Sequence, residues 1–74
     1  MINRRALLLD QLADAERSII KNETRIRQQT QLIAERERAG HDSAIAKELL
    51  GMLQGSYALH LAARDRIKVG ISSL

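Results

Sequence analysis

Residues 49–63 of this 74-residue chain contain no Asp, Glu, Lys or Arg. A helix that is apolar around most of its circumference is stable only when other surfaces cover it on several sides. One companion helix covers one side, so this segment predicts contact with another copy of the chain or with a partner protein. The segment is shorter than the ~18 apolar residues of a membrane span. We therefore expect no membrane insertion and a cytoplasmic protein.

The composition favours long helices and leaves few means of stabilising so small a chain. The sequence has no proline and only four glycines, the two residue types that most often interrupt helices. It has no cysteine, which excludes disulfides and thiolate metal sites. Because a chain of this length buries little core, oligomerisation is the remaining source of stability.

Helix signals divide the chain into two long helices joined by a turn. Asn3 is a suitable N-cap for the first helix, with Ile2 and Leu7 packing across it. Gly40 can end this helix in a left-handed conformation, and Asp42 or Ser43 can cap the next helix. The expected single domain, 1–74, therefore consists of a helix at about 3–39, a turn at 40–42, a helix at about 43–69 and a frayed tail at 70–74.

A short turn makes the two helices antiparallel neighbours, with facing residue numbers that sum to about 82. The helix at about 3–39 is the longer of the two, so its N-terminal part is expected to extend beyond the end of the helix at about 43–69. The leucines of that part are then without a partner in the same chain; they are Leu7, Leu8, Leu9 and Leu12. Seven-residue spacing of apolar residues predicts the seam between the helices. The expected seam consists of Leu12, Ile19, Ile26, Ile33, Leu49, Leu53, Leu61 and Ile67.

The predicted fold is all-α: an antiparallel two-helix hairpin that dimerises into a four-helix bundle. Gly51 and Gly55 lie in the middle of the helix expected at about 43–69, and each destabilises it by about 0.8–1 kcal/mol relative to alanine. Close approach of another helix would offset this cost, and drift on a tolerant surface is the alternative. The expected contacts between chains are Leu8, Leu9, Ile20, Gly51, Gly55 and Leu59.

His60 lies in the middle of an apolar face, where metal binding or a proton switch can be considered. The simpler interpretation is an interior histidine hydrogen-bonded across the hairpin to Glu23 or Asn22, because buried polar groups need partners. The sequence contains no spacing typical of a metal site, a catalytic triad or a phosphate-binding loop. We expect no enzymatic activity, no metal and no cofactor.

Basic residues gather toward the end of the hairpin that lies far from the turn. They suggest an alternative function, a dimer that contacts the phosphates of RNA or DNA. A solvated charged face is the simpler interpretation, since Tyr57 is the only aromatic residue available to stack on bases. The candidate contacts are Arg17, Lys21, Arg25, Arg64 and Lys68.

Several short motifs resemble those of a group of small bacterial helical-hairpin proteins of unknown function. The motifs are Gln29-x-x-x-Ile33-Ala34, Gly40-His41-Asp42, Leu49-Leu50, Leu59-His60 and Arg64-Asp65-Arg66. The resemblance covers about residues 12–67 and implies a free-standing small protein, with no activity or cofactor to transfer. The architecture is also similar to that of Rop-type RNA-binding hairpin dimers, by analogy of fold alone. The leading hypothesis is a self-associating interaction or regulatory module, with a separate protein partner as an alternative to the homodimer.

Overall fold

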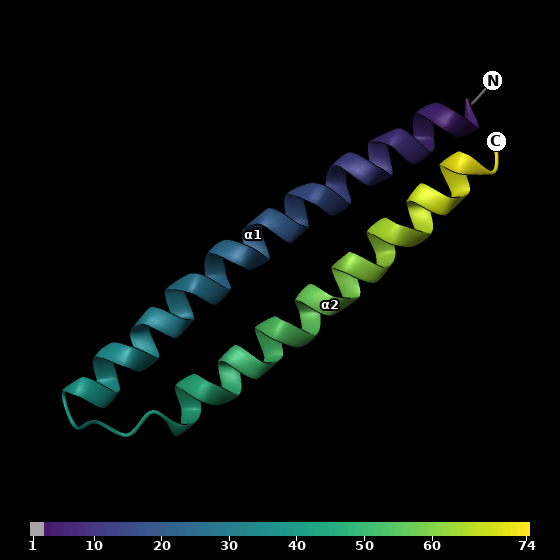
Figure 1. Ribbon diagram of the computed structural model, residues 1–74. Helices are drawn as coiled ribbons and strands as arrows, with labels where there is room; N and C mark the ends of the chain where they lie inside the picture. Colours follow the sequence, from purple (N-terminus) through teal and green to yellow (C-terminus); the bar gives the residue numbers. More distant parts are fainter. Residues whose placement is uncertain (1–2) are drawn as a thin grey trace.

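The computed structural model describes residues 3–74 as two helices joined by a short loop. Helix α1 spans Arg4–Arg38 and helix α2 spans Ala44–Ser72. They run antiparallel and side by side, so the beginning of α1 and the end of α2 lie together, opposite the loop (Figure 1). The described residues form a rod of 59 × 16 × 14 Å. The predicted all-α hairpin is confirmed.

Asn3 begins α1 as the sequence predicts. Its Oδ1 accepts hydrogen bonds from the backbone N–H groups of Arg5, at 3.0 Å, and Ala6, at 3.3 Å. These bonds satisfy two of the donors that the first turn of a helix leaves without partners. The expected packing of Ile2 on Leu7 lies outside the described residues. Neither helix of residues 3–74 has the length and hydropathy needed for a membrane span.

The turn follows the predicted chemistry closely. Gly40 has φ 75°, a left-handed conformation that a residue without Cβ adopts at little cost. The backbone N–H of His41 then donates to the carbonyl of Arg36 at 2.9 Å, which closes the end of α1. Asp42 supplies the cap of α2, because its Oδ1 accepts the N–H of Ala44 at 2.9 Å.

Ser43 serves the loop in a different way. Its side chain makes no capping bond to α2; instead the hydroxyl donates to Oε1 of Glu37 at 3.1 Å. The Nζ of Lys47 lies 2.9 Å from the same oxygen. Hydrogen bonds from Lys47 and then Ser43 hold the pKa of Glu37 below its ordinary value of 4.5. The beginning of α2 is thus tied to the last turns of α1.

The register of the two helices differs from the expected one by about one helical turn. Asn22 donates to Ser56 at 3.2 Å and Tyr57 donates to Glu23 at 2.9 Å. Facing residue numbers therefore sum to about 78–80, below the expected 82. Residues 41–43 are not helical, and extended residues advance about 3.3 Å each where helical ones advance about 1.5 Å. The loop therefore carries the start of α2 farther back along α1.

The predicted overhang of α1 does not form. α2 continues through Gly70 and ends three residues later than expected, at Ser72. A Cδ1 methyl of Leu8 lies 3.7 Å from the position that a Cβ at Gly70 would occupy. Leu8 and Leu12 are half-buried against α2, while Leu7 and Leu9 remain exposed.

The seam between the helices is thin and partly polar. Seven of the eight expected seam residues are buried or half-buried, but Leu49 is exposed and the neighbouring Leu50 turns inward instead. Ile19 is the only apolar residue within 3–74 that is buried. Asn22 and Gln29 are buried as well, and Nε2 of Gln29 donates to the carbonyl of Ala46 at 2.9 Å. The hairpin therefore gains little hydrophobic stabilisation from its own two helices.

Candidate interaction surface

One side of α2 carries a row of exposed apolar side chains. Ile45, Met52 and Leu59 recur at seven-residue intervals and are 82%, 71% and 72% exposed. Leu49 follows Ile45 by four residues and precedes Met52 by three, so it lies on the same side of the helix. We call these four residues the α2 stripe. α1 does not cover this apolar side of α2.

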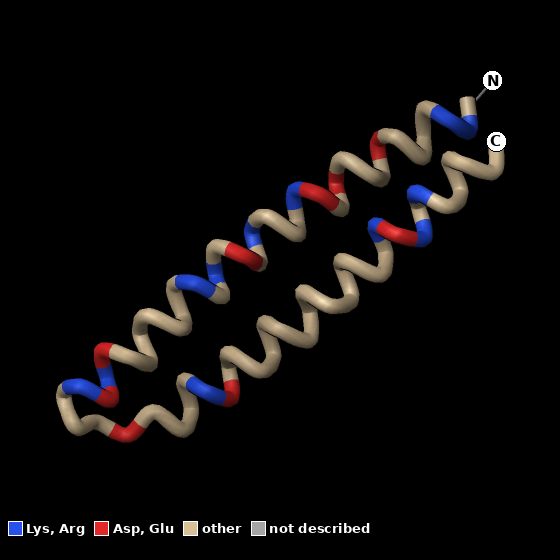
Figure 2. Tube along the Cα trace, viewed as in Figure 1, with Lys and Arg blue, Asp and Glu red and all other residues tan. Residues whose placement is uncertain are grey.

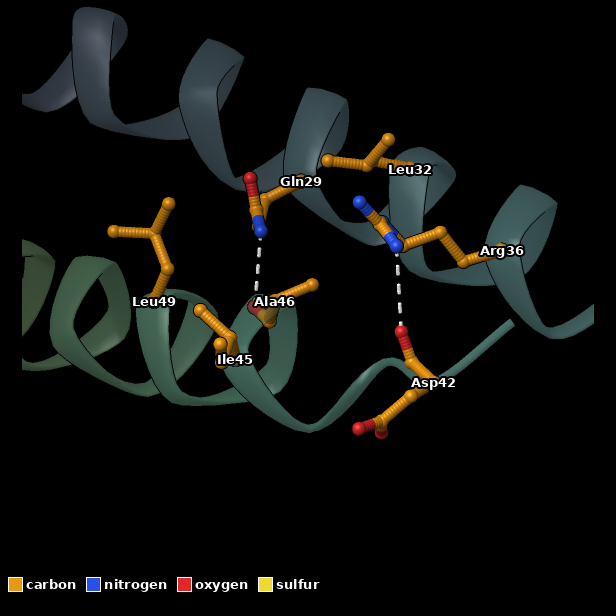
Figure 3. Close-up of a pocket in the computed structure, with 7 residues that line it drawn as sticks. All are labelled: Gln29, Leu32, Arg36, Asp42, Ile45, Ala46 and Leu49. Carbon is orange, nitrogen blue, oxygen red and sulfur yellow. Dashed lines mark hydrogen bonds between the residues drawn. The ribbon is translucent and has the colours of Figure 1, made fainter.

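An open groove of about 300 Å³ lies beside the α2 stripe at the loop end of the hairpin (Figure 3). Leu32 of α1 faces Ile45 and Leu49 of α2 across it. Two hydrogen bonds lie at this groove. Nε2 of Gln29 donates to the Ala46 carbonyl, and Nη1 of Arg36 donates to the Asp42 carbonyl at 3.4 Å. The residues that line it are Gln29, Leu32, Arg36, Asp42, Ile45, Ala46 and Leu49.

The groove defines two long sides of the hairpin. Leu32 and the α2 stripe lie on what we call the groove side. The ion pair of Glu37 with Lys47, at 2.9 Å, marks the opposite side, which we call the ion-pair side. Charged residues occur along all of α1, whereas the middle of α2 has none (Figure 2). The groove side is therefore apolar chiefly because of α2.

The two glycines in the middle of α2 are not required by the hairpin itself. A Cβ added at Gly51 or Gly55 would meet nothing within 4 Å. Both residues are exposed, and each lowers helix stability by about 0.8–1 kcal/mol relative to alanine. Gly55 lies one turn from Met52 and from Leu59, so it borders the α2 stripe. A glycine there leaves room for another backbone to come close.

The six residues expected to contact another chain do not share one side. Leu8 packs within the hairpin. Leu9 occupies the same place in the seven-residue repeat as Glu37, and Ile20 lies nearby in that repeat, so both belong to the ion-pair side. Leu59 lies on the groove side, with Gly55 at its border and Gly51 farther round the helix. A single partner helix cannot cover all six residues.

The interior pair expected between His60 and Glu23 does not form in this register. Glu23 instead accepts the hydrogen bond from Tyr57, and Asn22 bonds to Ser56. His60 is half-buried one turn farther along α2. The hydrogen bond to Glu23 raises the pKa of Tyr57 above its ordinary value of 10.0, and desolvation adds to the increase.

The described residues hold no group of three or more His, Cys, Asp or Glu side chains placed to bind a metal ion. His41 is exposed in the loop, far along the chain from His60. Every buried side-chain nitrogen or oxygen within 3–74 has a hydrogen-bond partner. The polar groups between the helices are thus used in holding the hairpin together.

Two of the five candidate nucleic-acid contacts are paired with acidic neighbours. Arg17 forms an ion pair with Asp14, three residues earlier on α1. Arg64 forms one with the adjacent Asp65, at 3.1 Å. These pairings reduce the positive charge that the two arginines present to a polyanion.

The other three candidates lie on different sides of the rod. Arg25 comes one seven-residue repeat before Leu32, and Lys21 one turn before Arg25, so both belong to the groove side. Lys68 comes three repeats after Lys47, which places it on the ion-pair side. The five basic residues therefore form no single stripe, although alternating charge is visible along α1 (Figure 2).

No protein-family model, curated protein or solved structure matches this chain. Ile45, Met52 and Leu32 are not among the contacts between chains that the sequence predicts, and Leu49 is predicted to lie in the seam. The spacing of residues 45, 52 and 59 was the available signal, because it forms a second seven-residue repeat beside the first.

Proposed function

We propose that this chain is a non-enzymatic helical hairpin that works as an interaction module by binding a second copy of itself through the α2 stripe. The observation that carries the proposal is the exposure of Ile45, Met52 and Leu59 on a hairpin in which Ile19 is the only buried apolar residue of the described residues 3–74. Burying one such side chain contributes roughly 1.5–3 kcal/mol. Contiguous exposed apolar surface commonly marks a protein–protein contact.

The surface area of the hairpin supports the same conclusion. The chain has a mass of 8.3 kDa and exposes 5661 Å². A compact folded monomer of this mass exposes about 4,600 Å², so the excess is about 1,100 Å². A stable interface of ordinary size buries about 800 Å² on each partner. One second copy is thus sufficient to cover the excess surface.

The groove side also indicates how α1 takes part. Leu32 lies beside the α2 stripe at the loop end, whereas Lys21 and Arg25 follow farther along the same side of α1. Apolar contact is therefore continuous along α2 and restricted to one end of α1. Two hairpins joined in this way form a four-helix assembly whose central contact is between the two α2 helices.

Sedimentation equilibrium of the purified protein tests this proposal. We expect a mass twice the 8.3 kDa of one chain. We expect Leu59→Lys to give the mass of a single chain at the same concentration. The dimer buries two copies of Leu59, one from each chain. The loss of both removes roughly 3–6 kcal/mol of association free energy and raises Kd by a factor of about 10²–10⁴.

Ile20→Lys is the matched control for this experiment. Ile20 is 62% exposed on the ion-pair side of α1, so the same substitution there leaves the α2 stripe intact. We expect this variant to keep the doubled mass. A single-chain mass for the unmodified protein contradicts self-association, and a doubled mass for Leu59→Lys contradicts the assignment of the α2 stripe.

A further inference from the structure

Two charges of opposite sign border the α2 stripe without ion-pair partners. Glu48 and Arg66 are both exposed, and neither takes part in the ion pairs of the described residues 3–74. They are eighteen residues apart, which is five full helical turns, so they lie on the same side of α2, about 27 Å from each other. Between them, residues 49–63 carry no charge.

We propose that two copies of this chain dock with their α2 helices antiparallel, each Glu48 beside the partner's Arg66. This inference rests on the proposed self-association and adds its direction and register. A twofold axis near residue 57, midway between the two charges, forms both ion pairs at once. An antiparallel pair in this register has facing residue numbers that sum to about 115.

The same register sets large side chains against small ones. Met52 faces the partner's Ala63, and Leu59 faces the partner's Ser56, in the alternation that lets two helices pack closely. Gly55 borders these contacts with no side chain of its own. The glycine that the hairpin does not need for its own packing is thus placed where a second backbone passes.

The groove receives a side chain in this arrangement. Leu49 faces the partner's Arg66, whose methylene groups can cover Leu49 and Leu32 while its guanidinium reaches Glu48. Arginine commonly buries its aliphatic stem on an apolar surface and keeps its charge at the edge. The groove of about 300 Å³ has room for such a side chain.

A parallel dimer through the same stripe is less favourable. Parallel helices in register bring Glu48 beside the partner's Glu48, and Arg66 beside the partner's Arg66. Like charges at such a contact repel each other, and large side chains such as Met52 then meet their own copies. Charge and side-chain size both favour the antiparallel direction.

Single cysteines distinguish the two directions, because the sequence has no cysteine of its own. In the antiparallel dimer, the two copies of residue 56 lie within about 5 Å of each other along the helix axes, and the two copies of residue 45 about 37 Å apart. A short bis-maleimide should therefore join two chains of the Ser56→Cys variant and none of the Ile45→Cys variant. A parallel dimer joins both.

Charge reversal provides a second test by sedimentation. Glu48→Arg and Arg66→Glu, each alone, lose both ion pairs and introduce repulsion, so each should raise the dimer Kd about tenfold. The double variant, Glu48→Arg with Arg66→Glu, restores opposite charges and should return Kd to near its original value. Recovery in the double variant excludes a simple loss of helix stability as the cause.

The outcomes separate this inference from the proposed function. A single-chain mass for the unmodified protein overturns both. If the mass is doubled, any one of three results overturns the antiparallel register and leaves self-association standing. These results are cross-linking of Ile45→Cys, absence of cross-linking of Ser56→Cys, and absence of recovery in the charge-swapped double variant. The expected pattern of all three measurements supports both.

Discussion

Replacing Ile19 with alanine tests whether the thin seam supports the hairpin. Ile19 is 7% exposed, and truncating a buried isoleucine to alanine costs about 2–5 kcal/mol. The seam around it is only partly closed, so we expect a loss of about 2–3 kcal/mol. A chain of this length has a total stability of only about 4–11 kcal/mol. The midpoint of thermal unfolding should fall by about 10–20 °C.

Ile20→Ala is the control, since the adjacent side chain points away from α2 and is 62% exposed. Exposed substitutions usually change stability by no more than about 0.5 kcal/mol, and alanine favours the helix slightly more than isoleucine does. Urea unfolding followed by circular dichroism measures the stability of both variants. The protein concentration is kept the same, because association contributes to the stability observed. An equal loss of stability in Ile20→Ala would refute the assignment of Ile19 to the seam.

Two further predictions concern the glycines and the single tyrosine. Gly51→Ala should raise the free energy of unfolding by about 0.8–1 kcal/mol. Gly40→Ala should lower the free energy of unfolding by about 1 kcal/mol, because Gly40 has φ 75°. Urea unfolding measures the effect of both substitutions. Absorbance titration should place the pKa of Tyr57 above 10.0, and Glu23→Gln should lower it. Because the folded pKa is raised, the Tyr57–Glu23 contact stabilises the hairpin fully below about pH 10, and this stabilisation disappears as pH rises through the folded pKa.

The fold could be predicted from the sequence because its signals are local. The capping side chain of Asn3, the left-handed glycine at 40 and the seven-residue spacing of Ile19, Ile26 and Ile33 each act within a turn or two of the chain. Such features depend little on the rest of the molecule. They were sufficient to predict two helices and an antiparallel turn.

The register and the exposed face of α2 could not be predicted in the same way. The register depends on how far residues 41–43 extend, and sequence does not fix that distance. In α2, Leu49 and Leu50 are chemically equivalent, so which of them turns inward follows from the register. Gly70 is expected to end the helix, yet α2 continues through it to Ser72, beside Leu8 of α1. Each of these differences arises from contact between residues far apart in the chain.

The rod shape affects how this protein behaves in solution. Its radius of gyration is 17.0 Å, whereas a compact chain of this length has one of about 11 Å. One hairpin alone therefore elutes from a gel-filtration column ahead of a compact protein of equal mass, and its rotation in water is faster about its long axis than across it.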